Sequence, residues 1–498
     1  MPELAVSRFA PARIAAVIVI LAALAAGLNG IGRSLWLDEA WVANSLNAPT
    51  LSGMLVYPGW LQSNPPLFLI FSRTAVRVLG LSNASFRIVP LLFSFLAIAA
   101  MLAASGRIFV PSFTVLASAL VALHPSAIEF SHTLKPYSEE LATTAMLILA
   151  TICYLKQPGS RQYLWLLAAA GISLPLAYSS AFLFPGVFLA VGATCAPDRG
   201  KRIALLAAVT GGSFLIIYWF CIRPNVSPEL YAFWAADADN RITAGLVAAL
   251  LGCVGAVVPA VLRLFRGTAG WRDWTRIVCF LPCLLLGASR ALGWYPASRR
   301  TLLFLLPCFF LLVMMIADDL TRRLTTPKRA LNIAAFGLTL VIVSKAITGQ
   351  LIGPPDRSGE NFAGAVGFLQ HRVATGDIVL VHACCKEGFE LYAAMYGWQK
   401  PPVIYGETGW PCCARGKDAR PGASTKPAAL QDLDSKIPRG FSGRIWLLYT
   451  TRPTHWAYVG LDEGNLWRNH VWDRGCPPGP YFDFGNLTVS PMNCAEVR

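Results

Sequence analysis

The chain has 498 residues, of which 55% are apolar and only 14% are charged, and its formal net charge is +15. A soluble protein of this length would form roughly three domains with about 25% charged residues, so the low charge content excludes that class. The positive charge does not indicate a nucleic-acid partner, because the basic residues lie between long apolar runs and not in clusters on a water-facing surface. The composition therefore predicts a membrane protein.

The charge is divided unevenly between two parts of the chain, which meet near Gln350, where the last long apolar run ends. Residues 351-498 carry 15 Lys and Arg against 14 Asp and Glu, as an ordinary soluble domain does. Residues 1-350 carry a net charge of +14. We therefore predict a transmembrane domain over 1-350 and a soluble domain over 351-498.

Long apolar runs fill the first part. A helix needs about 20 mostly apolar residues to cross a membrane, and eleven runs approach this length, at about 14-31, 86-104, 110-128, 139-155, 163-178, 180-196, 203-221, 243-262, 277-294, 301-317 and 331-349. These runs predict a polytopic α-helical membrane protein with about 11 transmembrane helices. The shorter run Leu67–Leu81 carries Arg73 and Arg77 on one face, which predicts an interfacial helix within the first outside loop, residues 32-85.

The basic residues of the loops predict the orientation, since loops rich in Lys and Arg stay in the cytoplasm. With a cytoplasmic N-terminus, the inner loops have a net charge of about +11 and the outer ones about +3. An odd number of spans then places residues 351-498 outside. The first run, which follows Arg8 and Arg13, also fits a cleaved signal peptide, and either alternative leaves residue 32 onward outside.

The C-terminal part has the pattern of a small α/β domain. Helical patterns cover residues 360-373 and 387-397, and strand-like runs cover 377-381 and 444-449. Six of the 13 cysteines lie in this part: Cys384, Cys385, Cys412, Cys413, Cys476 and Cys494. An even number in an oxidising compartment indicates disulfides, with 15 possible pairings. Zinc binding is the alternative, although no CxxC spacing supports it.

The first outside loop contains two adjacent carboxylates, Asp38 and Glu39, between Trp36 and Trp41. Tryptophans prefer the headgroup layer of a membrane. The carboxylates fit the start of a helix, where acids are favoured in the first turn. They also fit a carboxylate held at the membrane surface as a general base or cation ligand, with a pKa tuned by partial desolvation.

A second outside turn, residues 124-140, brings more ionisable groups to the same side. Glu129, Lys135 and Tyr137 face the same interface as Asp38, whereas His132 is interpreted as a polar loop residue. The adjacent acids at 139 and 140 follow a serine and are interpreted as helix-capping residues. The two outside segments together are the place where chemistry is expected.

Four segments in chain order carry a resemblance: Trp36-Leu37-Asp38-Glu39-Ala40, Asn64-Pro65-Pro66-Leu67-Phe68, Phe86-Arg87-Ile88-Val89-Pro90, and Phe130-Ser131 through Lys135-Pro136-Tyr137. With the predicted topology they resemble the signature of the GT-C membrane glycosyltransferases over about residues 10-350. The nearest branch comprises bacterial enzymes related to lipid A aminoarabinose transferases, protein O-mannosyltransferases and Rgt-type lipopolysaccharide glycosyltransferases. An exported C-terminal domain is usual in this group.

The resemblance implies a reaction. Such enzymes transfer a sugar from a polyprenyl-phosphate carrier, usually with inversion, to an envelope acceptor such as lipopolysaccharide, polysaccharide, lipid or protein. The transfer takes place on the outer side of the bacterial inner membrane, so membrane lipids are partners and the C-terminal domain is expected in the periplasm. No cofactor is implied with certainty, and a divalent cation stays open because relatives differ in metal use.

The resemblance also implies roles for single residues. Asp38 matches the catalytic loop acid, which is a base or a metal-linked carboxylate, and Glu39 is its neighbour. Lys135 and Tyr137 match the motif that contacts the donor phosphate, and Arg299-Arg300 resemble the Arg-Tyr that opens a late helix. The further candidates for the cavity or the acceptor site are Asn64, Arg87, Glu129 and His132.

This sequence departs from the family pattern at two positions. Thr133 stands where members often carry Glu, and Lys135 stands where Arg is typical, which keeps the charge but loses the planar fork that binds phosphate in two places. The chemistry still needs only cations near the departing phosphate and a base near the acceptor hydroxyl. The same Lys and Arg residues also fit ordinary anchors of span ends.

Two other functions remain open from the sequence. Many spans with intramembrane polar groups fit a lipid or solute transporter, although the two related halves that many transporters show are not visible here. A family member without catalysis would only bind lipid-linked sugar, an alternative that Thr133 and Lys135 keep open.

Overall fold

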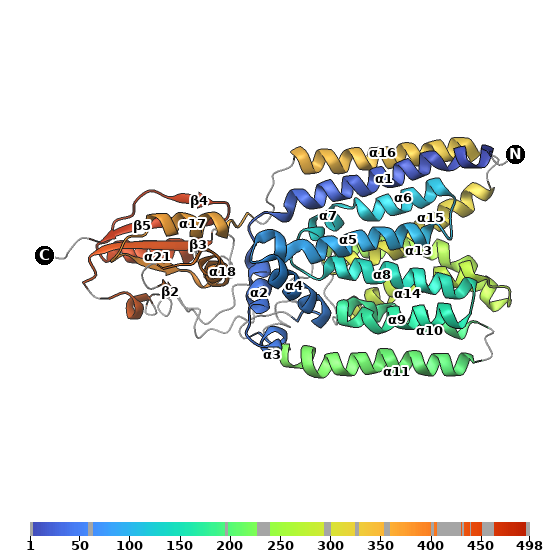
Figure 1. Ribbon diagram of the computed structural model, residues 1–498, viewed down its shortest axis with the longest axis horizontal. Coiled ribbons are helices and arrows are strands. Elements are labelled where there is room, and N and C mark those ends of the chain that lie inside the picture. The colour runs from blue at the N-terminus through green and yellow to red at the C-terminus, as the bar shows by residue number, and fades with distance from the viewer. Residues whose placement is uncertain are drawn as a thin grey trace.

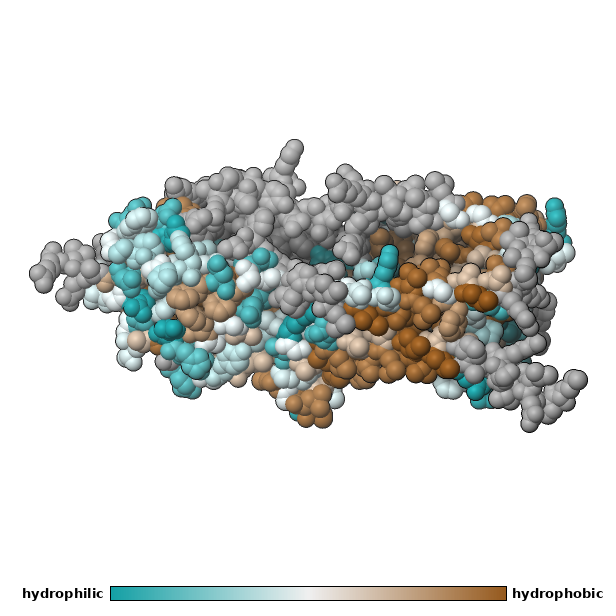
Figure 2. Space-filling view, turned by 90° about the horizontal axis from the view of Figure 1, so that it is seen from above, coloured by the Kyte–Doolittle hydropathy of each residue, from teal (hydrophilic) through white to brown (hydrophobic). Residues whose placement is uncertain are grey.

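We describe the chain from a computed structural model, which describes residues 3–57, 63–194, 198–226, 240–292, 300–323, 328–352, 359–399, 403–405, 430, 433–438, 440–450 and 463–494. The molecule is elongated, with a helical bundle at one end and a small α/β unit at the other (Figure 1). On the face shown in Figure 2, apolar side chains cover much of the bundle, whereas the described residues of the α/β unit are mostly hydrophilic. This division matches a protein with one part in a membrane and one part in water.

Each of the eleven expected runs contains a helix. The long helices of the bundle are α1 (Glu3–Ile31), α5 (Asn83–Ser105), α8 (Tyr137–Lys156), α11 (Arg199–Ile217), α13 (Asn240–Phe265), α14 (Trp271–Ala291), α15 (Leu306–Arg323) and α16 (Lys328–Ile352). The shorter ones are α6 (Pro111–Ala122), α7 (Pro125–Ser131), α9 (Ser160–Leu176) and α10 (Phe184–Gly192). Short 3₁₀ or π segments are η1 (Tyr178–Phe182), η2 (Tyr218–Ile222), η3 (Arg223–Asn225) and η4 (Leu303–Leu305).

The spans can be counted only over the described residues. Among the described residues, seven helices are long and apolar enough to cross a membrane, and an eighth arises if the bent pair α6 and α7 forms one span. The expected span at 180-196 contains the shorter apolar helix Tyr178–Gly192. The chain is thus a multi-pass membrane protein, in which at least one of the expected spans is bent and one is short.

The run expected as a continuous span at 110-128 is bent by 60° between α6 and α7. Pro125 has no backbone N–H and therefore starts a new helix more readily than it continues one. His124 caps this new helix by accepting a hydrogen bond from the Ser126 amide at 3.3 Å. The bend leads the chain into the turn that carries Lys135.

Three short helices lie at one end of the bundle, on the side of the α/β unit (Figure 1). They are α2 (Leu37–Leu46), α3 (Leu51–Leu55) and α4 (Pro66–Leu79). The last of them covers the run that was expected to form an interfacial helix, and it begins after Pro65 and ends before Gly80, whose φ of +81° favours glycine. We call this end of the bundle the loop end.

The C-terminal α/β unit contains α17 (Phe362–Arg372), α18 (Lys386–Tyr396) and α21 (Glu463–Asp473), with η5 (Ala383–Cys385). Its strands are β1 (Ile378–Val381), β2 (Val403–Tyr405), β3 (Gly443–Thr450), β4 (Phe482–Phe484) and β5 (Leu487–Cys494). They form one sheet in the order β2-β1-β3-β5-β4. β1 runs parallel to both β2 and β3, and β5 is antiparallel to both β3 and β4. The α/β composition expected for this part is therefore confirmed.

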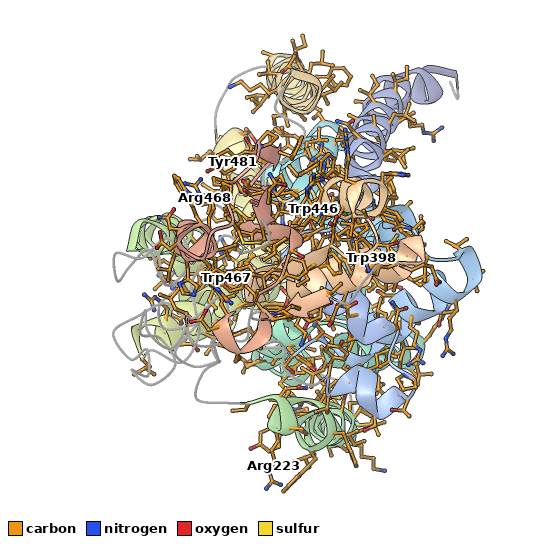
Figure 3. All side chains as sticks on the ribbon, turned by 90° about the vertical axis from the view of Figure 1, so that its left-hand side faces the viewer. Arg223, Trp398, Trp446, Trp467, Arg468 and Tyr481 are labelled. Atoms are coloured by element: carbon orange, nitrogen blue, oxygen red, sulfur yellow. A yellow bond between two sulfur atoms is a disulfide. The ribbon has the colours of Figure 1, made fainter. Side chains whose placement is uncertain are left out.

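The two faces of the sheet have different neighbours, because side chains alternate along a strand. Trp446 of β3 lies in a core that also contains residues of α17, α18 and α2. Its neighbours Ile445 and Leu447 lie in a second core with Trp467 of α21. Figure 3 shows Trp446 and Trp467 at separate positions within this unit. One face of the sheet is thus directed, through its helices, at the loop end of the bundle.

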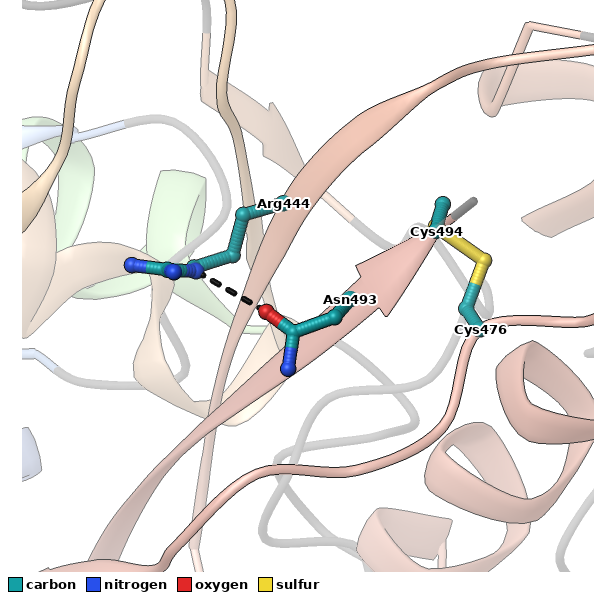
Figure 4. The surroundings of a disulfide bond; sticks show 4 residues. All are labelled: Arg444, Cys476, Asn493 and Cys494. Carbon is teal, nitrogen blue, oxygen red and sulfur yellow. Dashed lines mark hydrogen bonds between the residues drawn. A yellow bond between two sulfur atoms is a disulfide. The ribbon is translucent and has the colours of Figure 1, made fainter. Parts of the chain in front are cut away.

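The expected disulfides are present in part. Cys476 and Cys494 are bonded to each other at the end of β5 (Figure 4). Cys384 is also disulfide-bonded. Cys412 and Cys413 lie outside the described residues, so the full pairing of the six cysteines stays a prediction.

Candidate functional site at the loop end

The acidic pair lies at the start of α2. Asp38 and Glu39 occupy the first turn of this helix, as the helix-start interpretation predicted. Both are nevertheless buried, with 7% and 1% of their surface exposed. Burial of two adjacent carboxylates is costly unless each has a charged or hydrogen-bonding partner. Their partners differ, and so do the roles that they can have.

Glu39 is bound on all sides by donors. Arg87 of α5 donates from Nε at 2.9 Å and from Nη2 at 2.5 Å to its two oxygens. The backbone amide of Leu134 donates to the same carboxylate at 2.6 Å. Glu39 thus ties α2 to α5 and to the turn before α8. This saturation with donors suits Glu39 to organising the site.

Arg87 is equally well fixed. Besides Glu39, its guanidinium donates to backbone carbonyls of the segment that joins α1 to α2, with Arg33 O at 2.5 Å and Ser34 O at 3.0 Å. The side chain is 4% exposed. Arg87 is therefore held in a buried ion pair with Glu39, and its expected role at a cavity or acceptor site stays a prediction.

Asp38 has a more open set of contacts. Arg300 Nη1 lies 3.3 Å from Asp38 Oδ2, and Lys135 Nζ lies 4.0 Å from the same oxygen. The three residues come from separate segments, α2, the turn before α8 and the segment before η4. Two cations thus surround one carboxylate oxygen in a largely buried site. The expectation that Lys135 faces the same interface as Asp38 agrees with this geometry, which also brings Arg300 to Asp38.

The other predicted residues have mixed positions. Tyr137 begins α8 and packs its ring on Phe130 at 4.6 Å between centroids. Asn64 is 5% exposed, and its backbone carbonyl accepts a hydrogen bond from Tyr178 at 2.9 Å. Glu129 lies on α7 and is half-buried, and its backbone carbonyl accepts from Thr133 at 2.7 Å. Arg299 lies outside the described residues.

His132 is buried, in contrast to the polar loop residue that the sequence indicated. It is 8% exposed and packs so closely on α1 that a Cβ at Gly30 would lie 2.2 Å from its Cδ2. Burial, and then the charges of Arg33 and Arg87, lower the pKa of His132 to about 3. The imidazole is therefore neutral at physiological pH.

The sequence interpretation of Glu139 and Glu140 as capping acids is wrong. Pro136 occupies the N-cap position of α8, and neither acid caps the helix. Glu139 is fully buried and Glu140 is 8% exposed, and Glu139 has no hydrogen-bond partner for either carboxylate oxygen among the described residues. Both acids do lie in the first turn of α8, as expected. Sequence spacing alone does not reveal that other helices enclose this turn.

The donor set at this site does not fit a divalent cation. Among the described residues, no three His, Cys, Asp or Glu side chains are grouped as metal ligands. The carboxylates of Asp38 and Glu39 already face Arg300, Lys135 and Arg87, so additional positive charge would be repelled.

Comparisons with known proteins identify the fold. No family model and no curated protein matches the chain. The oligosaccharyltransferase of Archaeoglobus fulgidus, in a crystal structure with Zn and sulfate, has a TM-score of 0.52 and 13% identity, over 98% of this chain and 73% of that chain. The same organism's AglB, in complex with an inhibitory peptide and a dolichol-phosphate, has a TM-score of 0.53 and 11% identity, over 95% and 72%.

A looser similarity connects the chain with ArnT from Cupriavidus metallidurans bound to undecaprenyl phosphate. It covers 95% of this chain and 97% of that one, at 13% identity and a TM-score of 0.41. The oligosaccharyltransferase is a GT-C glycosyltransferase, and the motifs of this chain resemble that superfamily. The chain therefore has the fold of the GT-C membrane glycosyltransferases.

Proposed function

We propose that the protein is a glycosyltransferase that moves a sugar from a polyprenyl-phosphate donor to a cell-envelope acceptor. The observation that carries this proposal is the position of Asp38, a buried carboxylate within 3.3 Å of Arg300 and 4.0 Å of Lys135. A carboxylate serves as a base, and two cations bind a phosphate, so one small region contains both groups that the reaction needs. The GT-C fold supports the same reaction.

In the proposed reaction, the hydroxyl oxygen of the acceptor bonds to the anomeric carbon while the bond from that carbon to the phosphate oxygen breaks. The hydroxyl proton passes to the carboxylate of Asp38, and the electron pair of the broken bond stays with the polyprenyl phosphate. Attack opposite to the leaving phosphate inverts the anomeric carbon. Lys135 and Arg300 stabilise the additional negative charge on the phosphate.

Glu39 has a supporting role in this scheme. Its bonds to Arg87 and to the Leu134 amide fix α2 relative to the turn that ends at Lys135. The distance between the proposed base, Asp38, and one proposed phosphate-binding cation, Lys135, is thereby fixed. Tyr137 is two residues from Lys135 and is proposed to contact the donor, as is Arg299.

The substrates and the location belong to the same proposal. AglB was solved with a dolichol-phosphate, which supports a lipid-linked donor for a protein of this fold. We propose the bacterial inner membrane as the location, with the N-terminus in the cytoplasm and the loop end and the α/β unit in the periplasm. The acceptor is an envelope glycan, lipid or protein.

The experiment begins with a strain that lacks the gene for this chain. Its envelope glycans and lipids are compared by mass spectrometry with those of strains complemented by the wild type or by Asp38→Asn. We expect one envelope component to lack a sugar in the deletion strain and in the Asp38→Asn strain. Restoration of that sugar by Asp38→Asn would overturn the role of Asp38, and an unchanged envelope in the deletion strain would contradict the function.

Transport is the second candidate, because ionisable residues inside a span often mark a transport path. Glu139 and Glu140 lie buried within the span Tyr137–Lys156. Reconstituted vesicles with labelled polyprenyl-phosphate sugar distinguish the two functions. Movement of label across the bilayer without transfer to an acceptor would favour transport, and donor binding without either would indicate a non-catalytic protein.

Metal use is tested in the same assay. Since Asp38 and Glu39 already have cationic partners, we expect transfer to continue at the same rate after treatment with EDTA. Activity that is lost in EDTA and restored by one divalent cation would contradict this expectation.

A further inference from the structure

The segment that leads into the catalytic helix α2 is held by the C-terminal α/β unit. The backbone amide of Leu37 donates to Glu360 Oε2 at 2.8 Å, and the amide of Leu35 donates to the Tyr392 hydroxyl at 2.8 Å. The amide of Ala363 donates to Ser34 Oγ at 3.1 Å. Three contacts over four residues thus connect positions more than 300 residues apart in the sequence.

Glu360 occupies the place of a helix cap. The first amides of a helix have no acceptor within the helix, and a side-chain oxygen normally supplies one. The N-cap residue of α2 is Trp36, whose side chain has no oxygen, and the amide of Leu37 at the next position is bound by Glu360 instead. Glu360 is 3% exposed, so this charged contact is shielded from water. A carboxylate at this end also has a favourable interaction with the helix dipole.

Tyr392 fixes the same segment from a second direction. Its hydroxyl accepts from the Leu35 amide and donates to Asn83 Oδ1 at 2.6 Å. Asn83 begins α5 and donates in turn to the Gly32 carbonyl at 3.2 Å. Burial is the main cause that raises the pKa of Tyr392 to about 12, so its hydroxyl keeps its proton. The end of α1, the start of α5 and the start of α2 are connected through this one side chain.

The far end of α2 also contacts the α/β unit. Asn44 Nδ2 donates to Glu387 Oε2 of α18 at 2.8 Å. Between the two ends, Leu37, Trp41 and other residues of α2 lie in one apolar core with Phe389 and Tyr392. Helix α2 is therefore held at both ends and along one face by residues beyond 359.

We propose that the C-terminal α/β unit completes the catalytic site, with Glu360 as the residue that positions Asp38. Asp38 is the residue after Leu37, so the bond from Glu360 sets the position of the backbone that carries the catalytic carboxylate. The role in catalysis rests on the proposed glycosyl transfer, whereas the positioning of α2 does not. A displacement of about 1 Å at a reacting group reduces the rate on the order of 100-fold.

The test uses the full-length protein in detergent or nanodiscs, with the variants Glu360→Ala and Glu360→Gln. The control is Asp473→Ala, which removes an exposed acid at the end of α21, away from α2. Hydrogen exchange of peptides that cover residues 34-46 reports on α2 without any substrate. Single-turnover transfer and the KM for the polyprenyl-phosphate sugar report on catalysis.

We expect Glu360→Ala to accelerate exchange in residues 34-46 and to lower kcat by about 10- to 100-fold with little change in the donor KM. Glu360→Gln keeps an acceptor oxygen, so its loss of kcat is smaller, and Asp473→Ala matches the wild type. Unchanged exchange, or wild-type kcat in Glu360→Ala, would overturn the proposal.

If Glu360→Ala does not fold, the test rests on Glu360→Gln. Wild-type exchange and wild-type kcat in Glu360→Gln would then show that Glu360 contributes to stability alone. A wild-type protein that transfers no sugar would contradict the proposed function. In that case the exchange of residues 34-46 would still decide whether Glu360 positions α2.

Discussion

The loop end and the opposite end of the bundle contain the same residue types in different arrangements. At the opposite end, Asp273 lies 2.5 Å from Arg263 and 3.2 Å from Arg276, and Asp319 lies 2.6 Å from Arg276. These pairs join α13, α14 and α15 at short distances. At the loop end, Asp38 has two cations at 3.3 and 4.0 Å. The contacts of Asp38 are therefore longer than the contacts of Asp273 and Asp319 to Arg263 and Arg276 at 2.5 and 2.6 Å.

The balance of charge does not separate the two ends. At the opposite end, three acids face four arginines: Asp273, Asp318 and Asp319 contact Arg263, Arg272, Arg276 and Arg322. At the loop end, Asp38 and Glu39 face Arg87, Lys135 and Arg300, so both sets have one positive charge in excess. The distinction lies in the distances. Short contacts join the helices at the opposite end, whereas the longer contacts of Asp38 lie where the donor phosphate is proposed to bind.

The largest expected effect is on catalysis by Asp38→Asn. The amide cannot accept the proton of the acceptor, so we expect transfer to fall by about 100- to 10,000-fold. The matched variant is Asp318→Asn at the opposite end, which weakens contacts to Arg272 and Arg322. Transfer rates and thermal unfolding are measured for both. Asp318→Asn should unfold earlier with a rate near the wild type, and equal rate losses in the two variants would contradict the distinction.

The next effect concerns stability at the loop end. Arg87→Met leaves Glu39 as a buried carboxylate without its arginine, which costs about 3–5 kcal/mol. Arg322 is 60% exposed and also binds an aspartate, so Arg322→Met should cost at most about 1 kcal/mol. Thermal or denaturant unfolding in detergent compares the two. A smaller loss for Arg87→Met than for Arg322→Met would show that the buried pair does not organise the loop end.

A third effect concerns the cations beside Asp38. We expect Lys135→Ala and Arg300→Ala each to raise the apparent donor KM by about 10- to 100-fold, because a charged hydrogen bond contributes about 1.5–3 kcal/mol. The control is Arg223→Ala, whose guanidinium stacks on Trp219 at 4.4 Å and lies at the periphery (Figure 3). Lys135→Arg should retain donor use. An unchanged donor KM in both alanine variants would remove these residues from phosphate binding.

Sequence reasoning could predict the part of the site that depends on local motifs. The predicted orientation placed Asp38 and Lys135 at one interface, and the start of α2 at Leu37 agrees with acids in a first helical turn. The pairing of Glu39 with Arg87 was not predicted, although both residues were candidates, because a motif does not show which charges neutralise each other.

The contribution of the C-terminal unit could not be predicted. Glu360 belongs to no motif and reaches α2 only through the tertiary fold. The broken spans have a similar cause. Apolar runs predict that a segment enters the membrane, but Pro125 ends α6 and creates a bend of 60° that hydropathy does not register.

The smallest effect tests the charge balance at the loop end through pH. The pKa of His132 is lowered to about 3 in the folded protein by burial and by Arg33 and Arg87, from a usual value of 6.5. The neutral imidazole thus contributes stability fully above pH 6.5, and this contribution is lost as the pH falls from 6.5 toward 3, because the unfolded chain binds the proton first. The loss is at most about 1.4 kcal/mol per pH unit. His132→Gln lacks this titration, so its melting temperature should fall less than that of the wild type between pH 7 and pH 4.5. If the melting temperatures of the wild type and His132→Gln fell in parallel with pH, His132 would be protonated in the folded protein without a loss of stability. The loop end would then be less positive than its arginines indicate.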